Sequence, residues 1–220
     1  MLISFDYHIH SCYSYDSLNR PEDILRVELK KGVKSLSITD HNTIKGSLIA
    51  KKLAKKYDII VVTGIELYTN MGDLIILGCE EEIKNKDFFE VLDIANSSDW
   101  VTILPHPYVR HVIDTDFLKA IKGKVTAIEI FNSRASFATN TKAYKLAKAL
   151  NKPGTAGSDA HLLKELGNGL NFVYIEKFDE DSLMKSLKKG LIKIRPKYSN
   201  PLYHVASAII QIPKRFAMHI

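Results

Sequence analysis

The sequence predicts an α/β fold and favours a parallel barrel over an open, doubly wound sheet. Apolar runs alternate with amphipathic stretches from end to end, the pattern of repeated strand and helix units. Residues of metal-binding type follow six predicted strands: His8 and His10, Asp40 and His41, Glu66, His106, Asn132, Asp159 and His161. In a barrel the carboxyl ends of the strands meet at one mouth, whereas in an open sheet they spread along an edge. The strand-end residues therefore favour the barrel.

Length and composition are typical of one globular domain spanning residues 1–220. The chain has 220 residues, of which 45% are hydrophobic and 25% are charged, so it can bury a sizeable core. No apolar run reaches the ~18 residues of a membrane span, and the N-terminus lacks the basic region of a signal peptide. Two cysteines, Cys12 and Cys79, make no disulfide framework. We therefore expect a cytoplasmic protein without a transmembrane segment.

Positive charge is concentrated towards the C-terminal end. The chain has 31 basic and 25 acidic residues, and eight of the basic residues but none of the acidic ones follow Asp181. Residues 199–220 are expected to form a basic C-terminal helix or tail. It could contact nucleic acid, acidic lipid or a polyanionic substrate, or it could be a solvated face without a partner. Few aromatic residues accompany these charges, which favours the solvated face, and the sequence does not indicate an oligomeric state.

The predicted strands are short apolar runs bounded by polar residues or glycine. They cover residues 2–5, 33–39, 59–62, 74–77, 100–104, 125–131, 153–157, 170–175 and 191–194. The strand at 74–77 is expected to pair back on the one at 59–62, with residues 64–66 as the polar exit between them. The chain shows no internal repeat, low-complexity run or linker.

The predicted helices alternate with these strands. They cover residues 21–32, 43–56, 87–96, 117–121, 141–150, 179–189 and 202–213. Pro21 at a first helical position, followed by two acidic residues, marks the start of the first helix. Thr43 is expected to cap the second helix, with Leu48 on its inward side. The terminal helix carries apolar residues along one side and is expected to stop at Pro213.

The end of the first strand carries the clearest chemical signal. His8 and His10 are two residues apart on a strand, so their side chains point to the same face. Two imidazoles on one rigid element suit a metal ion better than an apolar core. Asp6 shares this face and is expected to orient one of the rings from behind.

Several short motifs occur together in a fixed order: residues 6–11 (DYHIHS), Asp16, residues 39–41 (TDH), 64–66 (GIE), 106–107 (HP) and 157–161 (GSDAH). Together they resemble the polymerase and histidinol phosphatase (PHP) family of metal-dependent phosphoesterases, over residues 2 to about 195. The resemblance implies a distorted, TIM-like (β/α)7 barrel with a cluster of two or three metals in its mouth.

The resemblance also implies which residues hold each ion. The first ion would be bound by His8, His10, Glu66 and Asp159, and the second by Asp16, His41 and His161. Glu66 would bridge to a third ion held with His106. Members with three metals carry a further histidine after the sixth strand, where this chain has Asn132. That departure puts the third ion in question, and Asn132 is expected to touch substrate or water instead.

Independently of the resemblance, these residue types suit the hydrolysis of phosphate esters. Imidazole and carboxylate suit divalent Mn, Fe or Zn, and two such ions can activate a water and clamp a phosphoryl group. Asp40 is assigned a catalytic role, as the carboxylate that orients a ligand ring. Arg134 and Arg110 follow strand ends, and arginine binds phosphate oxygens in pairs. Both are therefore candidates for substrate binding.

Two classes of function follow. The first is a hydrolase that uses a metal-activated water to cleave a phosphate ester of a nucleotide or another small phosphorylated metabolite. The second is an RNA-binding scaffold, similar to the PHP-like barrel subunit of archaeal ribonuclease P. A metal-dependent nuclease would combine features of both classes. A scaffold would have no need of the intact ligand set, so the sequence favours the hydrolase.

Overall fold

The computed structural model describes residues 1–111 and 113–217, without the side chains of Arg110 and residues 212–217. In chain order its elements are β1 (Leu2–Asp6), α1 (Pro21–Lys30), β2 (Ser35–Leu36), α2 (Lys45–Ala54), β3 (Ile60–Val61), β4 (Gly64–Thr69), β5 (Gly72–Leu77), α3 (Phe88–Ser97), β6 (Val101–Leu104), α4 (Pro107–Arg110), α5 (Thr115–Ile121), β7 (Ala127–Asn132), α6 (Phe137–Leu150), β8 (Gly154–Gly157), β9 (Gly169–Tyr174), α7 (Glu180–Lys188), β10 (Ile192–Pro196) and α8 (Pro201–Ala217).

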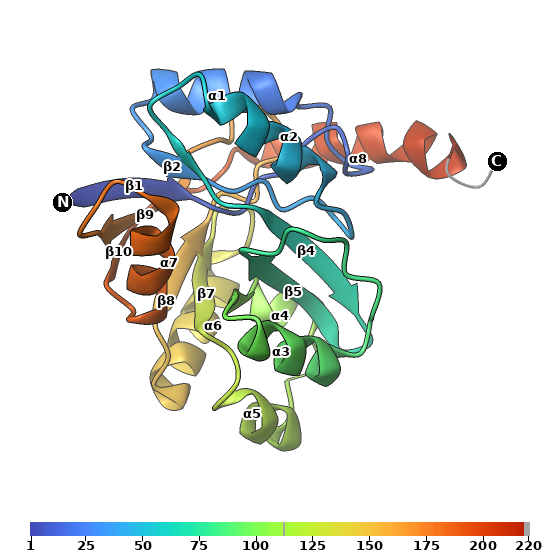
Figure 1. The fold of residues 1–220 in the computed structure, drawn as a ribbon. Helices are drawn as coiled ribbons and strands as arrows, with labels where there is room; N and C mark the ends of the chain where they lie inside the picture. The colour runs from blue at the N-terminus through green and yellow to red at the C-terminus, as the bar shows by residue number, and fades with distance from the viewer. Residues whose placement is uncertain (112, 218–220) are drawn as a thin grey trace.

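The strands form two five-stranded sheets (Figure 1). The first has the order β10-β9-β1-β2-β3, in which β1, β2 and β3 are parallel and β9 and β10 are antiparallel additions. The second has the order β4-β5-β6-β7-β8, in which β4, β5 and β6 are antiparallel and β6, β7 and β8 are parallel. The predicted α/β class is confirmed, and in each sheet the parallel strands run from the central strand to one edge, which is β3 in the first sheet and β8 in the second.

One closed ring of parallel strands is not present among the described residues. The ladders of the two sheets are joined only by isolated bridges, Ile9 with Ala160 and His41 with Glu66. The antiparallel hairpin β4–β5 has a connection too short to hold a helix, and β9 and β10 also pair antiparallel, although helix α7 lies between them in the sequence. The sequence predicted one barrel of parallel strands, whereas the structure has two sheets that each include antiparallel strands.

The hairpin β4–β5 also corrects an element assignment. Residues 64–66 were expected to be a strand exit, but they begin β4, and β5 pairs with β4 rather than with β3. Ile65 and Leu67 are fully buried on either side of Glu66, an alternation that indicates a strand. Gly72 turns the chain back with φ of 122°, a backbone conformation that favours glycine.

Helix α2 begins two residues later than predicted. Its N-cap is Ile44, without a side-chain cap, and the hydroxyl of Thr43 donates to Glu82 Oε1 at 2.7 Å instead. Leu48 is 40% exposed, so the expected inward position was wrong. The buried side of this helix carries small residues, among them Gly46 and Ala50, because the helix packs closely on the loops beneath it.

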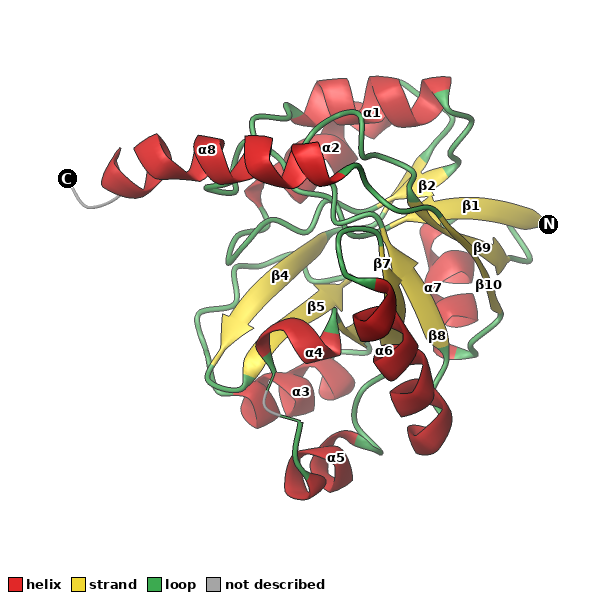
Figure 2. Ribbon diagram, turned by 180° about the vertical axis from the view of Figure 1, so that it is seen from behind, coloured by secondary structure: helices red, strands yellow, loops and turns green. Residues whose placement is uncertain are grey.

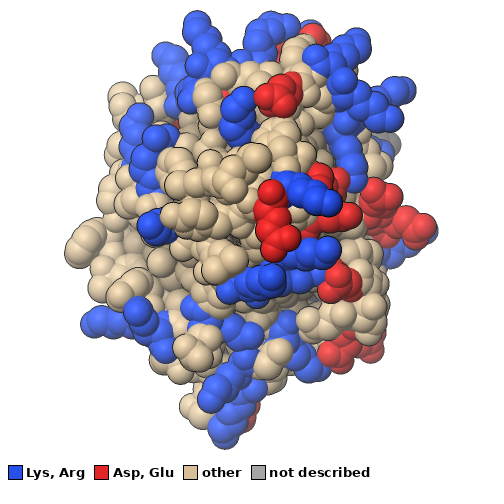
Figure 3. All heavy atoms as spheres, turned by 60° about the vertical axis from the view of Figure 1, so that its left-hand side comes forward, with Lys and Arg blue, Asp and Glu red and all other residues tan. Residues whose placement is uncertain are grey.

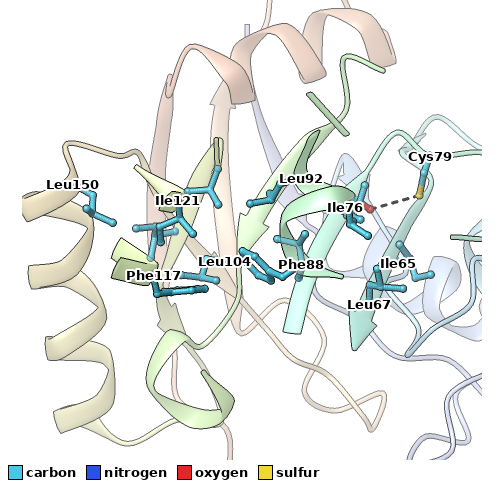
Figure 4. Close-up of a cluster of buried hydrophobic side chains, with 14 of the residues drawn as sticks. Ile65, Leu67, Ile76, Cys79, Phe88, Leu92, Leu104, Phe117, Ile121 and Leu150 are labelled. Carbon is cyan, nitrogen blue, oxygen red and sulfur yellow. Dashed lines mark hydrogen bonds between the residues drawn. The ribbon is translucent and has the colours of Figure 1, made fainter. Parts of the chain in front are cut away.

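Buried apolar side chains hold the two sheets together. One cluster contains Phe5 from β1, Ile75 from β5 and Ile103 from β6, so both sheets face a common interior. A second cluster fills the space between the second sheet and helices α3, α5 and α6 (Figure 4), with Phe88 and Phe117 fully or almost fully buried. Each such side chain contributes about 1.5–3 kcal/mol through its burial.

Helix α8 lies across one end of the molecule and projects beyond it (Figures 1 and 2). It continues past Pro213 to Ala217, so the prediction that the helix stops there was wrong; an internal proline removes one hydrogen bond and bends a helix without always ending it. Its apolar side faces solvent, since Leu202, Val205 and Ile209 are 71%, 58% and 63% exposed, whereas Ser207 is buried.

Charged side chains are dispersed on the face that carries β9, β10 and α7. Figure 3 shows Lys and Arg in separate groups on this face, with the acidic residues gathered in one part of it. Lys51, for example, lies between Glu80 and Glu180, at 2.9 and 3.0 Å.

The side chains of Lys214 and Arg215, part of the predicted basic tail, lie outside the described residues. No described helix is long and apolar enough to cross a membrane.

Candidate metal centre

All eight predicted metal ligands lie together at one pocket. They come from β4 and from the loops after β1, β2, β6 and β8, and comprise His8, His10, Asp16, His41, Glu66, His106, Asp159 and His161. Six of them line a cavity of about 240 Å³, and the remaining two, His8 and His10, are fully buried. The structure thus brings together residues that are up to 153 positions apart in the sequence.

Local backbone geometry positions these side chains. The chain after β1 is held to the chain after β8, because His10 N–H donates to Ala160 O at 2.9 Å and Ala160 N–H to His8 O at 3.2 Å. His106 and Asp159 have φ of 26° and 49°, in the left-handed region that residues other than glycine seldom adopt. Such conformations cost roughly 1–3 kcal/mol and concentrate at functional sites.

The ligand atoms fall into three overlapping groups whose members lie within 4.8 Å of one another. One group combines His10, Asp16, His41 and His161; a second combines His8, Glu66 and His106; a third combines His8, His10 and Asp159. In the first group, Asp16 Oδ2 lies 3.1 Å from His41 Nε2 and 3.0 Å from His161 Nε2. In the second, Glu66 Oε1 lies 3.0 Å from His106 Nε2.

Unpaired buried atoms show that these residues fit a divalent cation. Among the described residues, no hydrogen-bond partner exists for His8 Nε2, Asp16 Oδ1 and His106 Nδ1, whereas His41 Nδ1 and Glu66 Oε2 lie 2.9 Å apart and His10 Nε2 lies 3.3 Å from Asp159 Oδ1. Leaving such an atom buried and unpaired costs about 1–3 kcal/mol. Imidazole nitrogen and carboxylate oxygen are donors that Mn, Fe and Zn accept. A bound cation would therefore satisfy atoms that the protein leaves without partners.

The electrostatic balance of the site keeps its carboxylates ionised. Although burial opposes ionisation, His41 and His8 hold the pKa of Glu66 well below its usual value. Burial, with help from His161 and His41, lowers the pKa of His10 to about 3. Ionised carboxylate and neutral imidazole are the forms that bind metal ions. Against the effect of burial, the surrounding carboxylates raise the pKa values of His8 and His41, so a cation bound there would displace their protons.

Glu129 is a functional residue that the sequence analysis missed. It lies on β7, fully buried, and its two oxygens accept four hydrogen bonds. The donors are Tyr7 OH at 3.1 Å, His8 Nδ1 at 2.8 Å, His106 N–H at 2.8 Å and Asn132 Nδ2 at 2.9 Å. Glu129 therefore orients the His8 ring and fixes the backbone at His106. The available signal was a carboxylate between two isoleucines in an otherwise apolar strand.

Asn132 is engaged within the protein. Its amide nitrogen donates to Glu129 and, at 3.2 Å, to Asp159 Oδ2. Its Oδ1 accepts the backbone N–H of Arg134 at 2.9 Å. Asn132 lines the cavity, but these contacts make it a residue that positions Asp159.

Among the described residues, Asp40 has no hydrogen bond to a ligand ring. Its carboxylate accepts hydrogen bonds from Ser11 N–H and Ser11 Oγ, both at 2.6 Å, and from Ser14 Oγ at 3.0 Å. Ser14 Oγ in turn lies 3.3 Å from His10 Nδ1. Asp40 thus holds the loop after β1 and reaches the His10 ring through Ser14 rather than directly as predicted.

Among the described residues, Asp6 has no hydrogen bond to a ligand ring, and it interacts electrostatically with a second buried carboxyl group, Glu28. It accepts hydrogen bonds from Ser158 Oγ at 2.8 Å and Gly167 N–H at 2.7 Å. Burial raises the pKa of Asp6 to about 6. Burial and the adjacent Asp6 charge raise the pKa of Glu28 well above its usual value, so the Glu28 carboxyl keeps its proton beside Asp6.

We expect Glu28→Gln to stabilise the protein at neutral and higher pH. Because the folded-state pKa of Glu28 is raised, the unfolded chain releases this proton first, and stability is lost as the pH rises above about 4.5. The amide removes this penalty and can still donate to Asp6. Urea unfolding at pH 5 and pH 8 should show a gain at pH 8 of about 1–3 kcal/mol, with little gain at pH 5.

The control is Glu22→Gln, on the exposed side of the same helix α1. Glu22 forms an exposed ion pair with Arg26 at 3.4 Å, which contributes under about 1 kcal/mol. This variant should follow the wild type at both pH values. A Glu28→Gln variant whose stability also follows the wild type would contradict the raised pKa of Glu28.

Arg134 reaches the cavity from the loop after β7. Its guanidinium lies 3.4 Å from Glu165 Oε2 and donates to Ser207 Oγ on α8 at 2.6 Å. It also lines the cavity beside Asp159. The other predicted substrate-binding arginine, Arg110, has its side chain outside the described residues.

Comparisons with known proteins agree with this geometry. A family model described as PHP-associated matches residues 138–192. The uncharacterized protein MJ0417 of Methanocaldococcus jannaschii is 31% identical over 229 residues, covering 97% of this chain and 88% of that protein.

Two solved structures share the fold. One is a two-domain protein from Bacteroides vulgatus containing a predicted PHP-like metal-dependent phosphoesterase, with a TM-score of 0.78, 16% identity and coverage of 90% of this chain and 65% of that one. The other is the lesion-specific endonuclease EndoQ from Pyrococcus furiosus, with a TM-score of 0.62, 17% identity and coverage of 88% and 58%. Together with the buried histidine and carboxylate cluster, these relationships show that the chain belongs to the PHP family of metal-dependent phosphoesterases.

Proposed function

We propose that this protein hydrolyses the phosphate ester of a small phosphorylated molecule, such as a nucleotide, with the help of two divalent cations. The observation that carries the proposal is the convergence of eight ligand side chains, several with unpaired buried atoms, on one cavity. A protein that only used the fold as a scaffold would have no reason to keep these atoms buried and unpaired.

The three ligand groups suggest how the cations would be held. His10, Asp16, His41 and His161 would hold one, and His8, His10 and Asp159 would hold another, with Glu66 between them. His8, Glu66 and His106 form a third group that would suit a further ion, although Asn132 stands where members with three metals carry a histidine. When bound, such cations of Mn, Fe or Zn type lower the pKa of water and neutralise phosphoryl charge.

The protein's own residues supply orientation and charge. Glu129 fixes the His8 ring, and Asp40 steadies His10 through Ser14. Arg134 would donate to phosphoryl oxygens, because its guanidinium lines the cavity close to Asp159. Glu165 and Ser207 keep it in place.

We also propose that the two sheets are the halves of one distorted (β/α)7 barrel. The bridges at Ile9 and at His41 join the sheets at the end that carries the ligands, and a single apolar cluster fills the space between them. On this view residues 1–220 form one domain, with α8 added at its mouth.

A nuclease is the second candidate function. EndoQ, which has the same fold, is described as an endonuclease, and eight basic residues follow Asp181 in this chain. A nuclease that contacts several phosphates should bind oligonucleotides with a steep dependence on salt. Hydrolysis of a small ester should change little between 50 and 200 mM salt, which separates the two candidates.

The test combines metal analysis with a screen for phosphate release. We expect the purified protein to contain Mn, Fe or Zn, to lose phosphate release on chelation and to regain it when one of these ions returns. Its unfolding temperature should fall on chelation, because bound ions stabilise the folded state. The proposal is wrong if the metal-supplemented protein releases no phosphate from nucleotides, sugar phosphates or short oligonucleotides.

A further inference from the structure

Helix α8 contributes to the cavity that holds the ligand cluster. His204 and Gln211 line this cavity together with Asp159, His161 and Arg134. His204 is near enough to Arg134, Glu165 and Asp159 for their charges to act on its imidazole. The C-terminal segment, expected from its sequence to be a basic tail, is thus a wall of the pocket.

Buried hydrogen bonds fix the start of helix α8 to the loops that carry Ser133 and Glu165. Ser199 N–H donates to Ser133 O at 2.8 Å, and Ser199 Oγ donates to the buried carboxylate of Glu165. Almost two turns into the helix, the hydroxyl of Ser207 accepts a hydrogen bond from Arg134 and donates one to His204 O at 3.0 Å. The backbone that carries His204 is therefore tied to the arginine that faces the ligand cluster.

One ring nitrogen of His204, Nε2, is buried without a hydrogen-bond partner among the described residues. A buried nitrogen without a partner costs about 1–3 kcal/mol, and here it belongs to a residue that lines the cavity. The neighbouring outward-facing residue, Val205, is 58% exposed, so α8 presents its polar side to the cavity and its apolar side to solvent.

We propose that His204 binds the phosphoryl group of the substrate together with Arg134, and that the substrate is a phosphomonoester. This inference rests on the proposed function. A monoester has three terminal oxygens, so the cations can take some of them while Arg134 and His204 take another. A diester has only two, and its second ester group would have to fit in a cavity of about 240 Å³ that α8 closes on one side.

The experiment compares His204→Ala with the matched variant Val205→Ala on the same turn of α8. The readouts are KM and kcat for p-nitrophenyl phosphate and bis(p-nitrophenyl) phosphate, and the affinity for inorganic phosphate by equilibrium dialysis of the metal-loaded protein. His204→Ala should raise KM for the monoester and weaken phosphate binding, each about 10-fold, as expected for a lost hydrogen bond to a charged group. Any activity on the diester should keep its KM.

A conservative variant separates binding from a purely structural role. His204→Gln keeps a donor at a similar reach and should recover most of the phosphate affinity, whereas Val205→Ala should match the wild type throughout. Equal phosphate affinity in His204→Ala and wild type would overturn the role of His204. A wild type that prefers the diester would overturn the monoester assignment.

Failure of the proposed function has a different signature. In that case the wild type cleaves neither ester with any of the three metals. The dialysis measurement still decides the role of His204, because it reads the binding of inorganic phosphate without turnover. If phosphate binding then depends on His204, the proposed phosphate-binding role of His204 stands although the proposed hydrolysis does not. If the protein does not bind phosphate, or binds it equally well without His204, both proposals are wrong.

Discussion

Asp159→Asn is expected to lower kcat by about 10³-fold while leaving the fold intact. Asp159 Oδ1 lies 3.6 Å from His8 Nε2 and 3.3 Å from His10 Nε2, so its charge is central to one ligand group. Asparagine keeps the shape and tolerates the left-handed φ of 49° at this position better than alanine does. Steady-state kinetics and metal analysis should show both activity and metal content falling.

The same result is expected for His8→Ala, which removes a ring shared by two ligand groups. The matched control is Asp58→Asn, since Asp58 is 78% exposed and pairs only with Lys34 among the described residues. Its activity and metal content should equal those of the wild type. If Asp159→Asn or His8→Ala keeps wild-type turnover, the assignment of metal ligands is wrong.

Glu129→Gln should weaken metal binding by about 10- to 100-fold, although Glu129 belongs to none of the ligand groups. Its Oε1 faces Tyr7 OH and His8 Nδ1, and its Oε2 faces the N–H of His106 and the Asn132 amide. A glutamine NH₂ in either position would face donors, so either orientation breaks contacts that hold the site. Titration against a competing chelator measures the loss.

A graded control is available on the same network. Tyr7→Phe removes only one of the four hydrogen bonds to Glu129 and leaves its charge in place, so its effect on metal affinity should be several-fold smaller. Equal affinity in Glu129→Gln and wild type would show that the His8 ring keeps its orientation without the carboxylate.

The ligand cluster could be predicted from sequence because its signals are local. Most of the ligands lie at the end of an apolar run or just after one, although Asp16 lies in a polar loop and Glu66 lies within a strand. Strand alternation places His8 and His10 on one face. The donor types then restrict the chemistry. The partners of the ligands were not predictable in this way, since Glu129 lies inside a strand and meets His8 only through the pairing of distant segments.

The fold was predicted in class but not in detail. Alternating apolar and amphipathic segments indicate α/β structure, but they do not identify strand partners. The strand at residues 74–77 was expected to pair back on residues 59–62, and it pairs with β4 instead. The sequence also did not reveal that the apolar side of α8 faces solvent, for a different reason. An apolar side usually packs inward, but the surface under α8 carries Arg134 and Glu165, which require polar partners such as Ser207 and Ser199.

Two glycines make room for the buried carboxylates behind the ligands. A Cβ at Gly157 would overlap Glu129 Oε1, and one at Gly46, inside helix α2, would overlap Asp40 Oδ2. Exchanging a helical glycine for alanine usually stabilises a protein by about 0.4–1 kcal/mol. At Gly46 and Gly157 the same exchange would displace a buried carboxylate, so substitutions intended to raise the thermal stability of this protein should be made at other positions.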